Sequence, residues 1–365
     1  MKLRVQKDEI LPLLAAMANI ANRRPVQPIL SHLLLRSTER GLQLVASDGE
    51  IQLRGELELR VEEGGQTAIP ARKLYDICRT LADGSEILLH KNGERLTVRS
   101  GSARFTLPTL PAQDFPIMEE RAARISGNCN GEDFQRALAA ASTAMAHNDT
   151  RYFLNGVFVE IGEQKMRLVA TDGHRLARVE ITFAHSSNAE PYHGILPRKT
   201  VLELLRIVGS GDVAWSFDEQ GCRMQQGSQE FASRLVDANY PDYRRVIPVG
   251  QFTQCIIDRP TLKTALQQID VIASDKNPVC TLHFQPENLV LRSRNEEQEE
   301  GEISVPAALH GDATEIAFNT RYLLDAQNIF ASDELLIQVR DSASSALIRT
   351  QESDNPLYIV MPIRL

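Results

Sequence analysis

One short stretch occurs three times along this chain at nearly equal spacing. Residues 46–53 read ASDGEIQL, residues 170–177 read ATDGHRLA, and a fainter copy surrounds Asn295. Asp48 and Asp172 are 124 residues apart, and Asn295 follows 123 residues later. Because this period is close to one third of the 365 residues, the chain is predicted to contain three similar domains.

Apolar residues alternate with polar ones just before each copy, as at Leu42 and Leu44 or Met166 and Leu168. Alternation of this kind is typical of a half-buried strand, and the Asp-Gly dipeptide is typical of a turn. Each copy is therefore predicted to be a strand, a polar turn and a second strand.

Two helices are predicted in every repeat of about 124 residues, which is called a copy below. Ile10, Leu13, Leu14 and Met17 form the stripe of an amphipathic helix that has Pro12 in its first turn, and matching stripes begin at 134 and 262. Runs 29–35, 153–160 and 279–284 are predicted as the strands that follow. A second helix begins near 70, 197 and 319, and strands 86–90, 96–100 and 103–107 follow it in the first copy.

These elements predict an α+β fold in which each domain packs two helices on antiparallel sheets. Proline and glycine mark connectors at 108–125 and 247–255. The predicted domains are therefore 1–124, 125–252 and 253–365.

Several classes of protein are disfavoured by composition. No run of eighteen apolar residues occurs and the N-terminal segment 1–9 is too polar for a signal peptide, so we expect a cytoplasmic protein without a membrane segment or signal peptide. The five cysteines are odd in number, scattered and without a C-x-x-C pair, which argues against a disulfide framework and a zinc site. We expect no metal and no cofactor.

The net charge of −8 would count against nucleic-acid binding, but the charge is unevenly distributed. The six predicted helical segments together carry +4, so the remainder carries −12. Either these helices face a polyanion, or Arg72, Lys73, Arg198 and Lys199 only solvate helix starts. The loop 146–156 combines amides, a cation and two aromatic residues, which suits contact with single-stranded nucleic acid and equally suits an ordinary turn before a strand.

An enzyme would need His147, Asp149, Asp172 and His174 as metal ligands or as acid and base. No metal-binding, phosphate-binding or nucleophile motif accompanies them, and Asp172-Gly173 is also an ordinary turn dipeptide. A metalloenzyme is therefore the weaker hypothesis, and a three-domain scaffold that binds only proteins is another.

Three further segments carry a resemblance to a known family. With the stretch 170–177, the segments 151–156 (RYFLNG), 240–246 (YPDYRRV) and 360–365 (VMPIRL) are similar to the bacterial DNA polymerase III beta subunits, the sliding clamps, and the similarity covers the whole chain. Residues 28–30 and 70–73 fit the family too. The resemblance implies two chains that close head to tail into a six-domain ring around duplex DNA, with the helices lining its inner surface.

The resemblance also implies a non-catalytic processivity factor that is a homodimer. Its expected partners are the replicative polymerase catalytic subunit, the clamp loader and other proteins with a clamp-binding motif, which dock through a short peptide with aromatic or leucine side chains. The pocket implied for that peptide comprises Leu154, Thr171, Gly173, His174, Arg175, Leu176, Pro241, Arg245, Val246, Asn319, Tyr322, Ser345, Ile359, Val360, Met361, Pro362, Ile363 and Arg364. The apolar C-terminal run would then be covered by partners.

The family's DNA contacts map onto Arg24, Arg72, Asn148, Tyr152 and Phe153. Relatives have glutamine and tyrosine where this chain has Asn148 and Phe153, which shortens one amide and removes one hydroxyl. The residues predicted at the ring interface are Lys73, Arg104 and Phe105 in the first domain and Ile272, Ala273, Glu299 and Glu300 in the third. Edge strands are expected to pair there, with basic residues on one side facing the acidic run 296–302 on the other.

Overall fold

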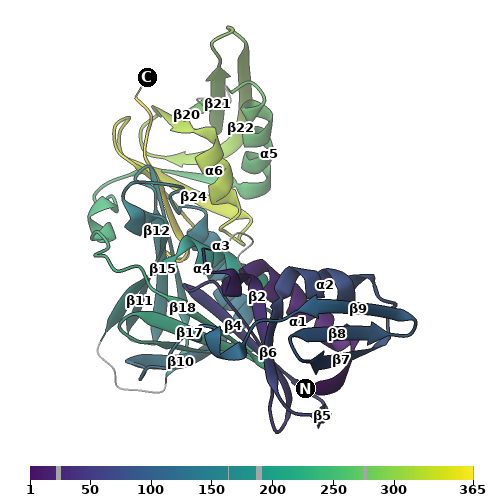
Figure 1. Ribbon diagram of the computed structural model, residues 1–365. Helices are drawn as coiled ribbons and strands as arrows, with labels where there is room; N and C mark the ends of the chain where they lie inside the picture. Colours follow the sequence, from purple (N-terminus) through teal and green to yellow (C-terminus); the bar gives the residue numbers. More distant parts are fainter. Residues whose placement is uncertain (22–25, 163, 186–190, 274–277, 365) are drawn as a thin grey trace. The chain divides into compact units, whose positions relative to one another are not determined.

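The computed structural model describes residues 1–21, 26–162, 164–185, 191–273 and 278–364. The chain forms two compact units, which are described separately. The first comprises 1–132, 183–189 and 202–235, and the second comprises 133–182, 190–201 and 236–365 (Figure 1).

The first unit contains two antiparallel sheets. The smaller has the order β5 (Val61–Glu63), β1 (Lys2–Gln6), β7 (Glu86–Asn92), β8 (Arg95–Ser100) and β9 (Ala103–Pro108). The larger has the order β14 (Ala184–His185), β10 (Ile125–Asn130), β16 (Asp212–Phe217), β17 (Gly221–Gln226), β18 (Gln229–Arg234), β4 (Ile51–Glu58), β3 (Gly41–Ser47), β2 (His32–Ser37) and β6 (Gln66–Pro70). This unit also contains the 3-10 helices η1 (Pro28–Ser31) and η2 (Ala112–Asp114).

Helices α1 (Lys7–Ile20) and α2 (Ala71–Thr80) pack side by side in the first unit (Figure 1). The buried stripe of α1 includes Ile10, Leu13, Leu14 and Met17, as predicted. Leu13 reaches the sheet because Gly55 leaves room: a Cβ at Gly55 would lie 2.5 Å from Cδ1 of Leu13. A glycine in the middle of β4 therefore allows close packing of helix on sheet.

The second unit contains one twelve-stranded antiparallel sheet. Its order is β15 (Tyr192–Pro197), β11 (Gly156–Gly162), β12 (Lys165–Thr171), β13 (Arg175–Thr182), β26 (Leu357–Val360), β25 (Ala346–Arg349), β24 (Glu334–Val339), β19 (Thr253–Asp258), β22 (Glu300–His310), β21 (Asn288–Arg294), β20 (Val279–Phe284) and β23 (Thr314–Asn319). The unit also holds α5 (Arg259–Asp270), α6 (Thr320–Gln327), η3 (Tyr152–Leu154), η4 (Tyr243–Val246) and most of α3 (Gly131–Ser142). Helix α4 (Arg198–Ile207) begins in this unit and continues into the first.

The two helices of the third copy start at side-chain caps. Oδ1 of Asp258 accepts a hydrogen bond from the backbone N–H of Thr261 at 2.8 Å, where α5 begins. Oδ1 of Asn319 accepts from the backbone N–H groups of Arg321 and Tyr322 at 2.9 and 3.3 Å, where α6 begins. Each cap satisfies helix N–H groups that have no partner inside the helix. In Figure 1, α5 and α6 cover the sheet formed by β20, β21 and β22.

The fold class is confirmed, since every copy has two helices with strands after each, and all named strand pairs are antiparallel. Each copy also opens with a strand that was not predicted, β1, β10 or β19. Three details of the prediction are wrong. The helix α1 begins at Lys7, so Pro12 is its sixth residue and not in its first turn; its side chain is exposed there. The run 29–35 begins as η1, and the run 153–160 begins as η3, because in each case a 3-10 turn precedes the strand.

One pattern of strand pairing recurs between copies. In the first unit, β18 of the second copy pairs with β4 of the first, with Phe231 opposite Leu53. In the second unit, β26 of the third copy pairs with β13 of the second, with Tyr358 opposite Ala177. The last strand of a copy therefore adds to the strand that follows the repeated turn of the preceding copy.

Candidate functional site

The repeated stretch is a turn held by its own side chains. Oδ1 of Asp172 accepts from the backbone N–H groups of His174 and Arg175 at 2.9 and 3.0 Å, and Gly173 has a φ of 90° that favours glycine. Asp48 does the same with Glu50 and Ile51 at 2.9 and 2.8 Å, and Gly49 has a φ of 94°. The signal that is strongest in the sequence thus has a structural cause.

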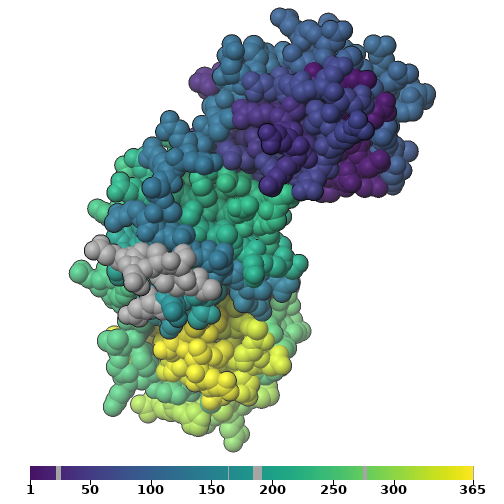
Figure 2. All heavy atoms as spheres, turned by 90° about the horizontal axis from the view of Figure 1, so that it is seen from below, coloured from purple at the N-terminus to yellow at the C-terminus, as the bar shows by residue number. Residues whose placement is uncertain are grey.

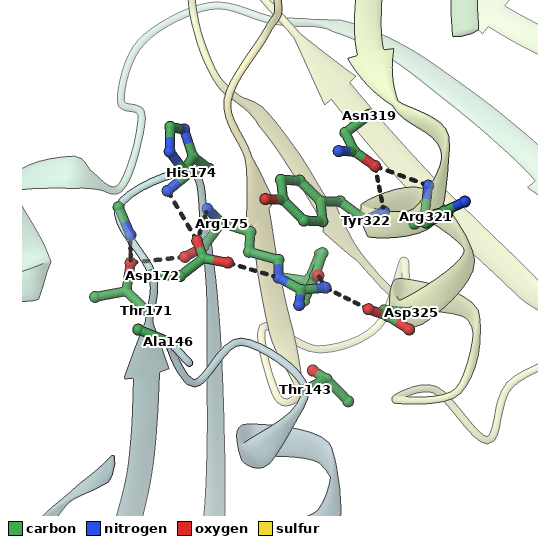
Figure 3. Close-up of polar contacts among 12 residues, drawn as sticks. Thr143, Ala146, Thr171, Asp172, His174, Arg175, Asn319, Arg321, Tyr322 and Asp325 are labelled. Atoms are coloured by element: carbon green, nitrogen blue, oxygen red, sulfur yellow. Dashed lines mark hydrogen bonds and ion pairs between the residues drawn. The ribbon is translucent and has the colours of Figure 1, made fainter. Parts of the chain in front are cut away.

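Arg175 follows this turn and joins three elements (Figure 3). Its Nε donates to Oδ2 of Asp172 at 3.0 Å, and its Nη1 donates to Oδ2 of Asp325 in α6 and to the Tyr358 hydroxyl of β26 at 3.3 Å. Its Cζ lies 4.3 Å from the centre of the Tyr322 ring. Burial alone would lower the pKa of Arg175, but Tyr358, Asp325 and Asp172 raise it above its usual value, so the guanidinium is charged and held.

The predicted pocket residues all belong to the second unit, and the structure brings most of them together. Leu176 pairs with Ile359, and both are buried in an apolar cluster with Val169, Tyr243 and Leu347. The backbone N–H of Met361 donates to the carbonyl of His174 at 2.8 Å, which ties the C-terminal segment to the turn.

Around this apolar floor lie more exposed groups. His174, Pro241, Arg245, Val246, Met361 and Arg364 are exposed, whereas Thr171, Gly173, Asn319, Tyr322, Ser345, Pro362 and Ile363 are half-buried. Leu154 and Val360 are buried. Figure 2 shows the end of the chain, in yellow, at the surface of the second unit. An apolar floor with polar groups at its edge suits a short linear peptide.

The expectation that partners cover the whole C-terminal run is wrong. Leu357, Tyr358, Ile359 and Val360 form β26, which lies between β13 and β25 and is buried by the protein's own sheet. Only the residues after Val360 leave the sheet, and the Met361 side chain is 38% exposed. The run is apolar mainly because a central strand is covered on both faces.

A cavity of about 590 Å³ also lies in the second unit, lined by residues that include Arg178, Ile247, Gln338, Arg349 and Leu357. None of its lining residues belongs to the predicted pocket. It adjoins the pocket floor, since Leu357 and Ile247 pack in the same apolar cluster as Leu176 and Ile359.

The predicted DNA contacts fall in different parts of the chain. Arg24 lies outside the described residues, and Arg72 is an exposed residue of α2 whose guanidinium lies 3.4 Å from Asp76 and over the Tyr75 ring. Tyr152 is 58% exposed, and its ring meets the half-buried Phe153 edge to face at 6.1 Å.

The loop that presents Tyr152 is well braced. Asn148 has a φ of 57°, a conformation that asparagine tolerates, and the backbone N–H of Asp149 donates to Oδ1 of Asn155 at 3.0 Å. Arg151 donates side-chain hydrogen bonds to Asp149, and this contact lowers the pKa of Asp149 to about 2. The loop is thus an ordered turn that leaves one aromatic ring exposed.

The acidic groups considered for an enzyme have other partners. Asp149 is paired with Arg151, and Asp172 holds the turn and Arg175. In the part of the chain that the structure describes, no three His, Cys, Asp or Glu side chains gather as metal ligands.

Most of the predicted interface residues are exposed. Phe105, in β9, is 36% exposed, and Lys73 and Arg104 are exposed. Ile272 and Ala273 are half-buried, while the neighbouring Val271 is 80% exposed and was missed. Sequence could have indicated Val271, which belongs to the same short apolar run.

The acidic run is partly neutralised within its own sheet. Glu300 lies 3.3 Å from Arg294, and Glu302 lies 2.5 Å from Arg292 across the β21–β22 ladder. Glu299 accepts from the Asn295 side chain at 2.6 Å.

Known proteins resemble the chain over its full length. Three family models of the DNA polymerase III beta subunit match the chain: the N-terminal domain matches residues 1–119, the central domain 128–242 and the C-terminal domain 244–364. The beta sliding clamp of Escherichia coli is 36% identical with all of both chains covered, and that of Pseudomonas putida is 35% identical over 99% of each.

Solved structures agree. The DNA polymerase III beta subunit sliding clamp of Pseudomonas aeruginosa, bound to griselimycin, has a TM-score of 0.96 at 35% identity with all of both chains covered. The DNA polymerase III beta subunit of Caulobacter crescentus has a TM-score of 0.93 at 31% identity, again over both whole chains. None of the helices in the described ranges is long and apolar enough to cross a membrane. Taken with the three repeated domains, these matches show that the chain belongs to the family of DNA polymerase III beta subunits, the beta sliding clamps.

Proposed function

We propose that two copies of this chain close head to tail into a ring that encircles duplex DNA, independent of sequence, and that the ring tethers the replicative polymerase without catalysing a reaction itself. The domain boundaries proposed for it are near residues 124 and 252, and the proposed location is the cytoplasm.

One observation carries the ring. The residues Phe105, Phe231 and Tyr358 are equivalent in the three copies, since they occupy the same position in the last strand, opposite Val98, Met224 and Ile348. Phe231 and Tyr358 are buried where β18 and β26 add to β4 and β13, whereas Phe105 is 36% exposed. Phe105 is the one of the three that a second chain would cover.

The strand that would cover Phe105 follows from the same register. By position in the ladders, Leu53, Ala177 and Gly301 are equivalent residues of the three repeats. Phe105 of one chain would therefore lie opposite Gly301 of the second chain. Within the described residues, β9 pairs only with β8, and the stretch 300–306 of β22 pairs only with β21. Two free edges remain, and pairing them would close both sheets.

Gly301 is well suited to receive an aromatic ring. A Cβ added there would lie 3.0 Å from Cδ1 of Ile269 and 3.1 Å from Cγ1 of Ile272, so an apolar surface lies directly beside it. Val271, Ile272 and Ala273 would supply the apolar edge of this interface, and Lys73 and Arg104 would face the acidic strand that carries Glu299 and Glu300. Exposed ion pairs contribute about 0–1 kcal/mol each, so the apolar contact is the main source of stability.

Retention on DNA tests the ring. The protein is loaded onto nicked circular DNA with a clamp loader, and the complex is separated from free protein before and after the circle is cut. We expect retention on the circle and loss from the linear product. Loss from the intact circle at the same rate would contradict encirclement.

The residues proposed to contact DNA are Arg24, Arg72, Asn148, Tyr152 and Phe153.

The absence of catalysis has its own test. Replacing His147 with alanine should leave polymerase stimulation unchanged, because nothing in the proposed function uses this imidazole. Metal-dependent hydrolysis by the purified chain, lost in this variant, would instead favour an enzyme.

We further propose that the surface formed by the turn at 171–176, the segment 241–246, Asn319, Tyr322 and the segment after Val360 binds the partner peptide. Its support is the shared apolar floor of Leu176 and Ile359 and the bond from Met361 to His174. The polymerase, the clamp loader and other proteins with such a peptide would compete for it. A labelled peptide with adjacent leucine and phenylalanine, competed by griselimycin, is a direct probe.

Deleting 361–365 tests this peptide site. The deletion removes one side of the site and leaves β26, which ends at Val360, in place. Peptide binding and polymerase stimulation should be lost, while dimerisation and retention on circular DNA persist. Full peptide affinity after the deletion would place the site elsewhere.

A further inference from the structure

The guanidinium of Arg175 is held by Asp172, which lies in the turn of the proposed peptide site, and by Asp325 and Tyr358, which lie outside that site. Asp172 bonds its Nε at 3.0 Å, Asp325 bonds its Nη1, and the Tyr358 hydroxyl accepts from the same Nη1 at 3.3 Å. Figure 3 shows Arg175 lying between Asp172 on one side and Asp325 on the other, beside the Tyr322 ring. The side chain of Arg175 is only 12% exposed.

Helix α6 supplies two of these contacts from one face. Asn319, Tyr322 and Asp325 are spaced by three residues, so they lie along the same side of the helix. Asn319 fixes the start of the helix, Tyr322 stacks on Arg175, and Asp325 bonds its guanidinium. The aromatic ring and the carboxylate therefore hold one cation together.

We propose that Asp325 is a positioning residue for the peptide site: through Arg175 it fixes the Tyr322 ring against the turn at 171–175. This inference rests on the proposed peptide-binding function. Asp325 itself need not touch the peptide. Without its carboxylate, Nη1 of Arg175 would retain only the neutral Tyr358 hydroxyl at 3.3 Å, and the guanidinium would pivot about Asp172 and leave the ring.

The charges make a selective effect possible. Arg175 keeps Asp172 in an Asp325→Asn variant, so no unpaired charge is buried and the fold is expected to survive. Asp325 is 42% exposed, which further limits the cost of the change to folding. The orientation of Tyr322 is lost instead, and peptide binding reports it.

The experiment measures binding of the labelled leucine-phenylalanine peptide to the full-length dimer. Asp325→Asn should weaken binding about tenfold, a coupling typical of linked sites. Asp325→Glu, which keeps the charge, should restore most of the affinity. Asp333→Asn is the matched control, because this exposed carboxylate follows the same helix and lies 3.7 Å from Arg259 instead. Unfolding temperature and dimerisation are measured for every variant.

A double-mutant comparison separates positioning from general destabilisation. If Asp325 acts through Arg175, adding Asp325→Asn to Arg175→Lys should weaken peptide binding no further. Should Asp325→Asn lower the unfolding temperature, the same comparison is made at a temperature where all variants are folded. Additive losses in the double variant would overturn the proposal.

Two further outcomes are distinguishable. If the unaltered protein binds the peptide and the 361–365 deletion abolishes binding, but Asp325→Asn binds normally, the positioning role is wrong and the peptide site stands. If the unaltered protein does not bind the peptide, the proposed site fails, and the role of Asp325 fails with it.

Discussion

Replacing Phe105 with alanine should weaken the dimer strongly without harming the fold. Phe105 lies in the edge strand β9, and 36% of its surface is exposed. Its counterparts Phe231 and Tyr358 are covered by a neighbouring strand, so the proposed interface covers Phe105 in the same way.

The expected loss of dimer stability follows from the exposed area of the Phe105 side chain. An aromatic side chain has roughly 200 Å² of surface, so about 70 Å² of Phe105 is available for burial at the interface. At about 25 cal/mol per Å² this contributes about 1.8 kcal/mol. A head-to-tail ring of two chains contains the contact twice, so the dimer should lose about 3.5 kcal/mol, or about 300-fold in its dissociation constant.

Sedimentation over a range of protein concentrations measures the change. Ile117→Ala is a matched control, since Ile117 is 37% exposed and lies outside β9. The Phe105→Ala monomer should unfold at nearly the same temperature as the unaltered chain and still bind the labelled peptide. A dissociation constant within a factor of two of the control would refute the assignment of β9 to the interface.

Three other measurements test separate features. Direct binding to DNA should be weak and should fall steeply with salt. Replacing the proposed contacts Arg24 and Arg72 with alanine should lower the slope of log affinity against log salt by up to about 2, or about 0.9 for each phosphate contact, and an unchanged slope would exclude them. Because Arg151 lowers the pKa of Asp149 from 3.8 to about 2, this carboxylate stabilises the folded loop fully above its unfolded pKa, and the stabilisation is lost as the pH falls through about 2. The protection of the loop amides, measured as their exchange rate relative to the intrinsic rate at each pH, should therefore be unchanged down to pH values near 4, and earlier loss of protection would contradict the contact. All five cysteines are buried, and burial raises the pKa of Cys78, Cys222, Cys255 and Cys280 to about 12, so a thiol reagent should label none in the native protein and five after unfolding, and rapid native labelling would count against this packing.

The repeated turns and helical stripes could be recognised from the sequence because their causes are local. Asp48 and Asp172 bond backbone N–H groups two and three residues ahead, and Ile10, Leu13, Leu14 and Met17 are buried at helical spacing. Local contacts of this kind leave a pattern in the order of residues, so the number of copies and the α+β class followed from it.

The pairing between copies was decided only by the tertiary structure. The residues around Leu357 and Ile359 do not indicate that β26 lies between β13 and β25. Their apolar side chains predict that the run is buried, but they do not identify the segments that bury it. For this reason the sequence favoured cover by partner proteins. The contacts of Asp325 and Tyr358 with Arg175 could not be predicted for the same reason, because these residues are 150 and 183 positions away from Arg175 in the sequence. Their contact depends on how strands and a helix from different copies converge, and no local pattern records that convergence.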